Sequence, residues 1–362
     1  MAGMLLMILR KPDNFREHIQ YAMGAIIAKI AYDYDMALEN DPFVKLAEAS
    51  ADNFSKASQP GQWMVDMIPI REWAALTFLP QSTDILLVQY VPTWFPGAAF
   101  KRQAAEWKKV NDHLHAKPFN DVVEKMKAGT AGDSVLRGLL TPEDGCLIDE
   151  EEEDVIKWVV GAVYSGGADT TVCALTTFVL AMVLFPEVQG KAQAEIERVI
   201  GVERLPGIAD RPSLPYVEAV YKETLRWHPV APLAVPHRVT KDDQYDGYMI
   251  PAGSTIVANI WAMTRSQPDS NLFKPERHLH VPEGGGNHVE QDPRTYVFGF
   301  GRRICPGMNL ADSEVWLGVA SLLAAFKILK KSDGQGGFIT PKEDYEQGII
   351  SYVPSPPRQA VG

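Results

Sequence analysis

The sequence predicts a mainly α-helical fold with a small β-sheet. Several long stretches carry apolar residues at the three- and four-residue spacing of a helix, and residues 155–185 are almost entirely apolar. Strand-like alternation is confined to residues 233–260. The sequence has no internal repeat and no low-complexity linker, so we expect residues 1–362 to form a single domain.

The first 150 residues are expected to form helices joined by loops. Residues 1–10 are apolar but fall short of the roughly 20 residues that a membrane-spanning helix needs. We therefore expect a packed helix there and no membrane anchor in this chain. Periodic apolar positions predict helices at 15–38, 43–57 and 98–127, whereas the glycine and turn residues of 128–148 predict a loop.

The apolar stretch at 155–185 is expected to be a long central helix. About 31 helical residues span about 46 Å, and a helix that is apolar all round is typical of the buried centre of a large domain. Asp169 lies inside the stretch and argues against a plain membrane span. The six acidic residues from Asp149 to Asp154 directly precede it, and we interpret them as its solvated start, since carboxylates are favoured at a helix N-terminus.

The rest of the chain combines further helices with the strand-like region. Apolar periodicity predicts helices at 187–200, 213–228 and 308–327. Within the strand-like region, Asp246 and Gly247 stand between two tyrosines, which is typical of a two-residue β-hairpin turn.

Composition excludes several classes of function. The formal net charge is -11, so electrostatically driven nucleic-acid binding is not expected. The three cysteines, Cys146, Cys173 and Cys305, are far apart in sequence and indicate neither a disulfide scaffold nor a zinc cluster. The sequence has no phosphate-binding loop and no complete dinucleotide-binding fingerprint.

The segment Phe298-Gly-Phe-Gly-Arg-Arg-Ile-Cys305-Pro-Gly307 is the strongest candidate for a functional site. Glycines on both sides let the backbone fold tightly around the Cys305 sulfur, and the helix expected after it points its positive end at the same sulfur. Neighbouring arginines add positive charge, and these features together favour the thiolate form. A thiolate held in a preformed loop is a suitable ligand for a redox metal centre.

The spacing Phe-x-x-Gly-x-Arg-x-Cys-x-Gly resembles the haem-binding loop of the cytochrome P450 family. Three further segments resemble motifs of the same family and occur in the same order. They are Glu223 to Arg226 (Glu-x-x-Arg), Pro275 to Arg277 (Pro-x-Arg), and Gly166 to Thr171, which matches the oxygen-binding turn of the family's central helix. The resemblance covers essentially the whole chain, is nearest to fungal microsomal members, and implies a cytochrome P450 fold.

The resemblance implies haem b as the cofactor, with Cys305 as the axial ligand of its iron. It implies that Phe298 and Gly307 line the cysteine loop and that Arg303 contacts a haem propionate. His237 or Arg238, after the strand-like turn, is a candidate for the second propionate. The cofactor-binding residues expected from the sequence are Phe298, Arg303, Cys305, Gly307, His237 and Arg238.

Two further groups of residues acquire roles through the same resemblance. Glu223 and Arg226 are three apart on one helix and can pair, and Arg277 can complete a structural network that supports the cysteine loop. Thr170 is expected to turn its hydroxyl into a local opening of the central helix and to donate to dioxygen there, while Asp169 relays protons. The alternative for Thr170 is a hydroxyl bonded to the carbonyl four residues earlier.

The resemblance implies a monooxygenase that inserts one oxygen atom of dioxygen into an apolar small molecule, within fungal secondary metabolism. Electrons would come from an NADPH-dependent flavoprotein reductase, and the full-length protein would contact the endoplasmic reticulum membrane. Two alternatives stay open: an isomerase or dehydratase of the same fold, and a haem-poor, non-catalytic fragment of an incomplete gene prediction.

The chain departs from the family pattern in two places. The match starts well inside the family's fold, so its N-terminal anchor, first strands and a Trp-x-x-x-Arg haem contact are expected upstream of Met1. Residues 71–88 separate two segments that family members join almost directly. Codons for Arg71 to Trp73 can contain a splice donor, and Leu87-Val88 can place an acceptor, so we interpret 71–88 as a retained intron. A tolerated surface-loop insertion is the alternative.

Overall fold

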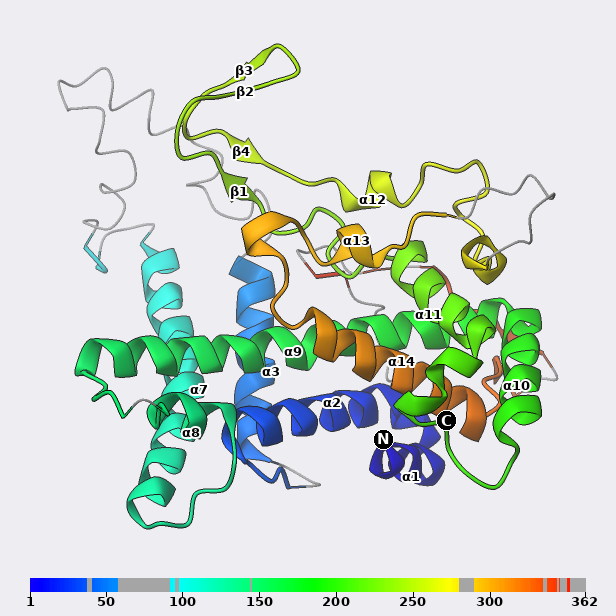
Figure 1. The fold of residues 1–362 in the computed structure, drawn as a ribbon, viewed down its shortest axis with the longest axis horizontal. Coiled ribbons are helices and arrows are strands. Elements are labelled where there is room, and N and C mark those ends of the chain that lie inside the picture. Colours follow the sequence, from blue (N-terminus) through cyan, green and yellow to red (C-terminus); the bar gives the residue numbers. More distant parts are fainter. Residues whose placement is uncertain are drawn as a thin grey trace. The chain divides into compact units, whose positions relative to one another are not determined.

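The computed structural model describes residues 1–37, 41–57, 92–94, 98–143, 145–279, 290–334, 337–343, 345 and 350–351. Residues 71–88, interpreted above as a retained intron, lie outside the described residues. Helices make up most of the described chain and the strands are few and short, which confirms the predicted fold class (Figure 1).

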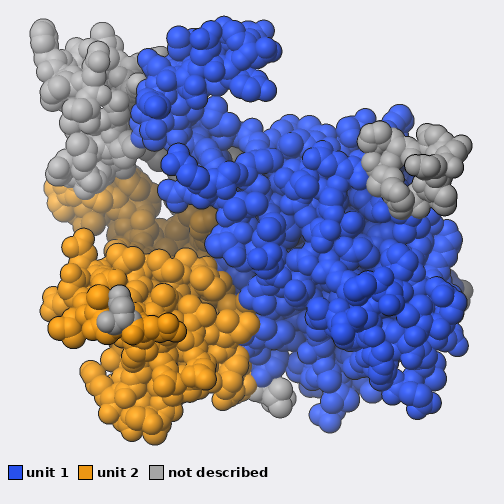
Figure 2. Space-filling view, in the orientation of Figure 1, with its two compact units in different colours: residues 1–26, 166–362 blue, residues 27–165 orange. Residues whose placement is uncertain are grey.

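The chain divides into two compact units, one of residues 1–26 with 166–362 and the other of residues 27–165 (Figure 2). The boundaries fall inside helix α2 (Phe15–Tyr32) and helix α9 (Glu150–Leu184). The expectation of a single domain stays a prediction. Each unit is described separately below.

The unit of residues 27–165 is built from helices. It holds α3 (Pro42–Ala57), α7 (Ala99–Lys127), α8 (Val135–Leu140), the end of α2 and the first part of α9. Helix α2 ends at Tyr32, earlier than the predicted 38, because Asp33 has a φ of 51°, in the left-handed region.

Helix α8 lies inside the predicted loop 128–148, so that prediction is wrong for six of its residues. The Ser134 hydroxyl accepts a hydrogen bond from the Arg137 N–H at 3.2 Å and caps the helix, and Leu136 is fully buried beneath it. A single capped turn and a half is too short to produce a recognisable apolar period.

Helix α9 begins at Glu150, and its first turn contains the acidic residues expected there. The Asp149 carboxylate caps this end by accepting from the Glu152 N–H at 2.8 Å. The prediction that the helix is buried all round is correct only beyond about Thr171. Nearer its start, Val155 is 55% exposed and Val159 is 50% exposed, so the same apolar composition covers two different environments.

Among the described residues, α9 is the helix with the length and composition to cross a membrane, although 67% of its most apolar stretch is buried in the protein. The core helix of a globular domain passes the same test of length and composition. That burial matches the predicted role of a central helix.

In the described part of the other unit, six helices pack around an apolar core (Figure 1). They are α1 (Ala2–Arg10), the start of α2, the second half of α9, α10 (Pro186–Ile200), α11 (Pro215–Trp227) and α14 (Met308–Ala325). Met4, Leu5 and Ile8 of α1 are buried in that core, as a packed N-terminal helix requires. Gly318 lets α14 approach α9 closely, because a Cβ there would lie 2.7 Å from Leu175 Cδ2.

Short elements connect these helices. They are the 3-10 turns η1 (Pro12–Asn14), η2 (Ile208–Ser213), η3 (Pro275–His278) and η4 (Gly301–Arg303), with the short helices α12 (Ile260–Met263) and α13 (Arg294–Val297). The turns η3 and η4 and the helix α13 carry or flank the candidate site residues.

The described strands form three separate antiparallel pairs, where one small sheet was predicted. They are β1 (His237–Arg238) with β4 (Thr255–Ile256), β2 (Asp243–Tyr245) with β3 (Tyr248–Ile250), and β5 (Lys331–Ser332) with β6 (Phe338–Ile339). The predicted turn joins β2 to β3: Asp246 has a φ of 48° and Gly247 a φ of 81°, as a two-residue hairpin turn requires.

Candidate functional site

The Cys305 segment forms a closed backbone loop between α13 and α14. The Cys305 N–H donates to the Phe298 carbonyl at 2.8 Å, which joins the two ends of the loop. Gly299 and Gly301 have φ values of 80° and 59°, in the left-handed region that glycine adopts without strain. The glycine pattern in the sequence therefore corresponds to two turns that fold the backbone around the cysteine.

The Cys305 side chain is exposed at the start of α14. Gly307 is the N-cap residue of that helix, and a Cβ at this position would lie 3.8 Å from the Cys305 Sγ atom. Glycine therefore keeps side-chain atoms away from one side of the sulfur. An exposed sulfur beside a helix N-terminus is open to a ligand atom.

Phe298 stands at the first end of the cysteine loop. Its side chain is half-buried and packs against the apolar core of its unit. Its carbonyl group makes the bond to the Cys305 N–H, so Phe298 attaches the cysteine loop to the core.

Three exposed basic residues remain available for a ligand. Arg303 belongs to η4, and His237 and Arg238 form β1. Within the described ranges of the chain, none of these three side chains makes a hydrogen bond or an ion pair. An accessible thiol and unpaired basic side chains suit a ligand that offers a metal centre and carboxylate groups, which are the groups of haem.

Glu223 and Arg226 form a fully buried pair on α11. Arg226 donates to both carboxylate oxygens of Glu223, from Nε to Oε2 at 2.8 Å and from Nη2 to Oε1 at 2.9 Å. The rest of the Arg226 guanidinium donates to the carbonyl groups of Thr264 and Ser270 at 2.8 and 2.9 Å. The pair therefore joins α11 to the chain that follows α12.

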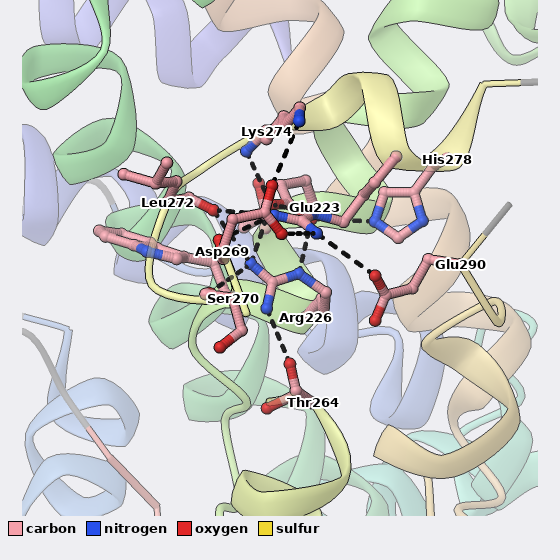
Figure 3. Close-up of polar contacts among 12 residues, drawn as sticks. Glu223, Arg226, Thr264, Asp269, Ser270, Leu272, Lys274, His278 and Glu290 are labelled. Carbon is pink, nitrogen blue, oxygen red and sulfur yellow. Dashed lines mark hydrogen bonds and ion pairs between the residues drawn. The ribbon is translucent and has the colours of Figure 1, made fainter. Parts of the chain in front are cut away.

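Arg277 joins this pair, so the structure brings together the three network residues expected from the sequence. Its Nε donates to Glu223 Oε1 at 3.0 Å. Figure 3 shows that residues of η3 and the chain beside it surround the same carboxylate. The Lys274 N–H donates to Oε1 at 2.7 Å, and His278 Nε2 lies 3.0 Å from Oε2.

Burial alone would raise the pKa of Glu223. The hydrogen bonds with His278 and Arg226 and the nearby arginine charges outweigh burial, and hold the pKa below its ordinary value. Reasoning from the sequence did not identify Lys274 and His278 as partners of the Glu223 carboxylate. Their positions beside Pro275 and Arg277 are the signal that could have found them.

Thr170 and Asp169 lie half-buried on an unbroken stretch of α9. The helix does not open at the preceding glycines, which corrects that expectation. The Thr170 hydroxyl donates to the Gly166 carbonyl at 2.8 Å, four residues earlier, which is the alternative considered for it. Its hydrogen is therefore engaged with the backbone, and its oxygen is left as an acceptor.

Glu314, nine residues beyond Cys305 on α14, is a buried carboxyl group that the sequence did not single out. It is 6% exposed, and its Oε1 atom has no hydrogen-bond partner among the described residues. Burial raises the pKa of Glu314 to about 7.

Known proteins resemble this chain along nearly its whole length. A family model described as Cytochrome P450 matches residues 2–351. Cytochrome P450 monooxygenase claR of Ampulloclitocybe clavipes is 41% identical over 352 residues, which cover 96% of this chain and 61% of that protein. Cytochrome P450 monooxygenase 176 of Postia placenta is 40% identical over 361 residues, which cover 97% of this chain and 65% of that protein.

The chain thus spans less than two thirds of the length of these relatives. Among solved structures, a zebra fish cytochrome P450 determined with progesterone has a TM-score of 0.68 and 21% identity to this chain. The match covers 93% of this chain and 69% of that one, and it indicates a shared fold.

Proposed function

The chain belongs to the cytochrome P450 family, and on that premise we propose that it acts as a haem-thiolate monooxygenase. The reaction would insert one oxygen atom of dioxygen into an apolar small molecule, within fungal secondary metabolism. The observation that carries this proposal is the exposed Cys305 thiol in its glycine-bounded loop at the start of α14. The names of the fungal relatives support the reaction class.

The family implies a haem cofactor, and we propose haem b for this protein. Cys305 would bind the iron through Sγ, and Gly307 would keep the adjacent space clear. The exposed and unpaired Arg303, His237 and Arg238 would hold the propionate groups. When bound, the haem supplies dioxygen activation, and a thiolate ligand favours cleavage of the O–O bond.

Asp169 and Thr170 would deliver protons from solvent to the haem site. The Thr170 hydroxyl gives its hydrogen to the Gly166 carbonyl, so its oxygen can accept a hydrogen bond from a water molecule and fix that water's position. Asp169 is the adjacent half-buried carboxyl group and can exchange protons with solvent. In this arrangement Thr170 positions the water molecule that carries the proton, and Asp169 supplies that water with a new proton from solvent.

Members of the family generally use a redox partner and apolar substrates. We propose an NADPH-dependent flavoprotein reductase as the electron donor for this protein. The exposed Arg302, in the cysteine loop, would attract an acidic partner surface. For the full-length protein we propose the endoplasmic reticulum membrane as the location.

The Cys305→Ala variant tests the proposal. The wild-type chain loaded with haem should show the red-shifted absorption band of a thiolate-ligated ferrous haem with carbon monoxide, and the variant should lose that band. Cys146→Ala is the matched control, because Cys146 is also an exposed cysteine. A Cys305→Ala protein that keeps the band would refute the assignment of the ligand.

A further inference from the structure

A second charged network joins the two sides of the Cys305 loop. Arg294 on α13 stands four residues before Phe298, and Asp312 on α14 stands five residues after Gly307. Arg294 Nη1 donates to Asp312 Oδ1 at 3.0 Å. The Arg294–Asp312 pair is therefore a second connection between the two ends of the loop, in addition to the backbone hydrogen bond from Cys305 to Phe298.

Asp312 is the centre of this network. Besides Arg294, it accepts a hydrogen bond from the Tyr221 hydroxyl of α11 at 2.9 Å. Arg211 of η2 also donates to it, from Nη2 to Oδ1 at 3.0 Å and from Nη1 to Oδ2. The Arg211 guanidinium lies over the rings of Tyr221 and Trp316, 5.3 and 5.5 Å from their centroids. One carboxylate on α14 is thus held by three other elements.

Arg294 is anchored to α11 as well. It donates to both oxygens of Asp292, from Nε at 2.9 Å and from Nη2 at 2.5 Å. Asp292 in turn pairs with Lys222 of α11 at 3.0 Å. Since α11 also carries the buried Glu223, this helix takes part in both networks.

This cluster differs from an ordinary surface salt bridge. Its three central side chains are mostly buried, with 17% exposed for Arg211, 20% for Asp312 and 31% for Arg294. Exposed isolated pairs contribute little because water screens them and both side chains lose freedom. Here four donor groups converge on one carboxylate, and each arginine is held by a second carboxylate.

The cysteine loop lies between Arg294 and Asp312 and has few hydrogen bonds of its own that would fix its position. Residues 300–307 are all exposed, and among the described residues the hydrogen bonds of this stretch are backbone bonds, such as Ile304 N–H to the Gly301 carbonyl at 3.2 Å. Backbone bonds fix the internal shape of the loop. Its position relative to α11 and α14 depends on its two ends.

We propose that Asp312 is a positioning residue that, with Arg294 and Arg211, fixes the ends of the cysteine loop and so holds the Cys305 sulfur where it can bind iron. The identity of the bound metal rests on the proposed function. The claim that Asp312 fixes the ends of the loop concerns the chain alone and can be tested without haem.

The first test measures hydrogen exchange of backbone amides in the Asp312→Asn variant without haem. The substitution keeps the shape of the side chain and removes its charge. Exchange of the amides of Cys305 and Met308 should accelerate roughly tenfold, because hydrogen bonds to a charged partner are lost at the loop ends. Amides of Glu223 and Arg226 on α11 should keep their rates. Asp52→Asn, which removes an exposed partner of Lys56, should leave the loop unchanged.

The second test is spectroscopic. With haem bound, Asp312→Asn should convert a large part of the thiolate-type carbon monoxide band into the band of a protonated or displaced cysteine. An Arg294→Gln, Asp312→Asn double variant should lose less of the band than the sum of the two single variants, since both substitutions remove the Arg294–Asp312 interaction. If Asp312→Asn fails to fold, Arg294→Gln tests the same pair by the same two measurements.

Accelerated exchange confined to the loop, together with a diminished thiolate band, supports the proposal. Unchanged exchange at Cys305 and Met308 overturns it, and so does an unchanged band in a folded Asp312→Asn protein. If the wild-type protein binds no haem and the variant still shows accelerated loop exchange, the proposed function is contradicted. The role of Asp312 in fixing the loop is then still supported.

Discussion

Replacing Glu223 with glutamine should destabilise the protein severely. The carboxylate is fully buried, and its two oxygens receive Arg226, Arg277, the Lys274 N–H and His278. Glutamine has nearly the same shape but carries one carbonyl oxygen and one NH₂ group in place of two acceptors. The substitution therefore tests charge and hydrogen bonding with little change in packing.

The expected cost follows from the geometry. The glutamine carbonyl can take the Oε1 position, which receives three donors: Arg226 Nη2 at 2.9 Å, the Lys274 N–H at 2.7 Å and Arg277 Nε at 3.0 Å. Its NH₂ group then faces the Nε–H of Arg226, and a buried donor left without an acceptor costs about 1–3 kcal/mol. Loss of the negative charge leaves the buried Arg226 uncompensated, and breaking a buried ion pair costs about 3–5 kcal/mol in all.

Urea unfolding followed by far-ultraviolet circular dichroism measures this cost. A loss of about 3–5 kcal/mol is a large share of the 5–15 kcal/mol typical of folded proteins, so the unfolding midpoint should fall strongly. Glu106→Gln is the matched control: Glu106 pairs with Lys109 at the same three-residue spacing, but at 70% exposure, and should cost only about 0.2–0.5 kcal/mol. Equal midpoints for the two variants would refute the claim that burial gives the Glu223 network its importance.

Three further outcomes are expected. Glu314→Gln should stabilise the protein at pH 8 by about 2–3 kcal/mol more than at pH 5, since a folded-state pKa of about 7, above the ordinary value of 4.5, makes stability fall as pH rises through that range; a constant difference in thermal unfolding at both pH values would contradict this. Thr170→Ala should release hydrogen peroxide and lower the product formed per NADPH consumed, whereas Thr170→Ser should keep the coupling; equal coupling in both variants would exclude the role of the hydroxyl. Sequencing of cDNA across codons 65–95 should show transcripts that lack the codons for residues 71–87. If most transcripts contain these codons, residues 71–88 are a genuine loop.

Spacing within one helical turn or one tight turn was enough to predict several features. The pairing of Glu223 with Arg226 follows from their separation by three residues on one helix. The turn at Asp246-Gly247 follows from residue types that accept a positive φ. The tight loop around Cys305 follows in the same way from its flanking glycines, because these preferences act over a few residues and do not depend on the rest of the fold.

The sequence pattern failed where burial depends on distant neighbours. Helix α9 is apolar along most of its length, yet Val155 and Val159 are exposed while Leu175 and Phe178 are fully buried. Composition shows only that a face can be buried, and the packing of other elements decides which part of it is. The Thr170 hydroxyl likewise took the nearest acceptor, the Gly166 carbonyl, because the helix stays closed there.

By itself the sequence determined the helical class, the cysteine loop and the family resemblance, because each depends on residue types at short, fixed spacing. Only the tertiary structure decided that Asp312 joins Arg294 to Arg211, since Arg211 and Asp312 are 101 residues apart. It likewise decided that the Lys274 N–H and His278 reach Glu223. Contacts between distant segments form when helices pack and bring their side chains together, and no periodicity along the chain records which charged residues will meet.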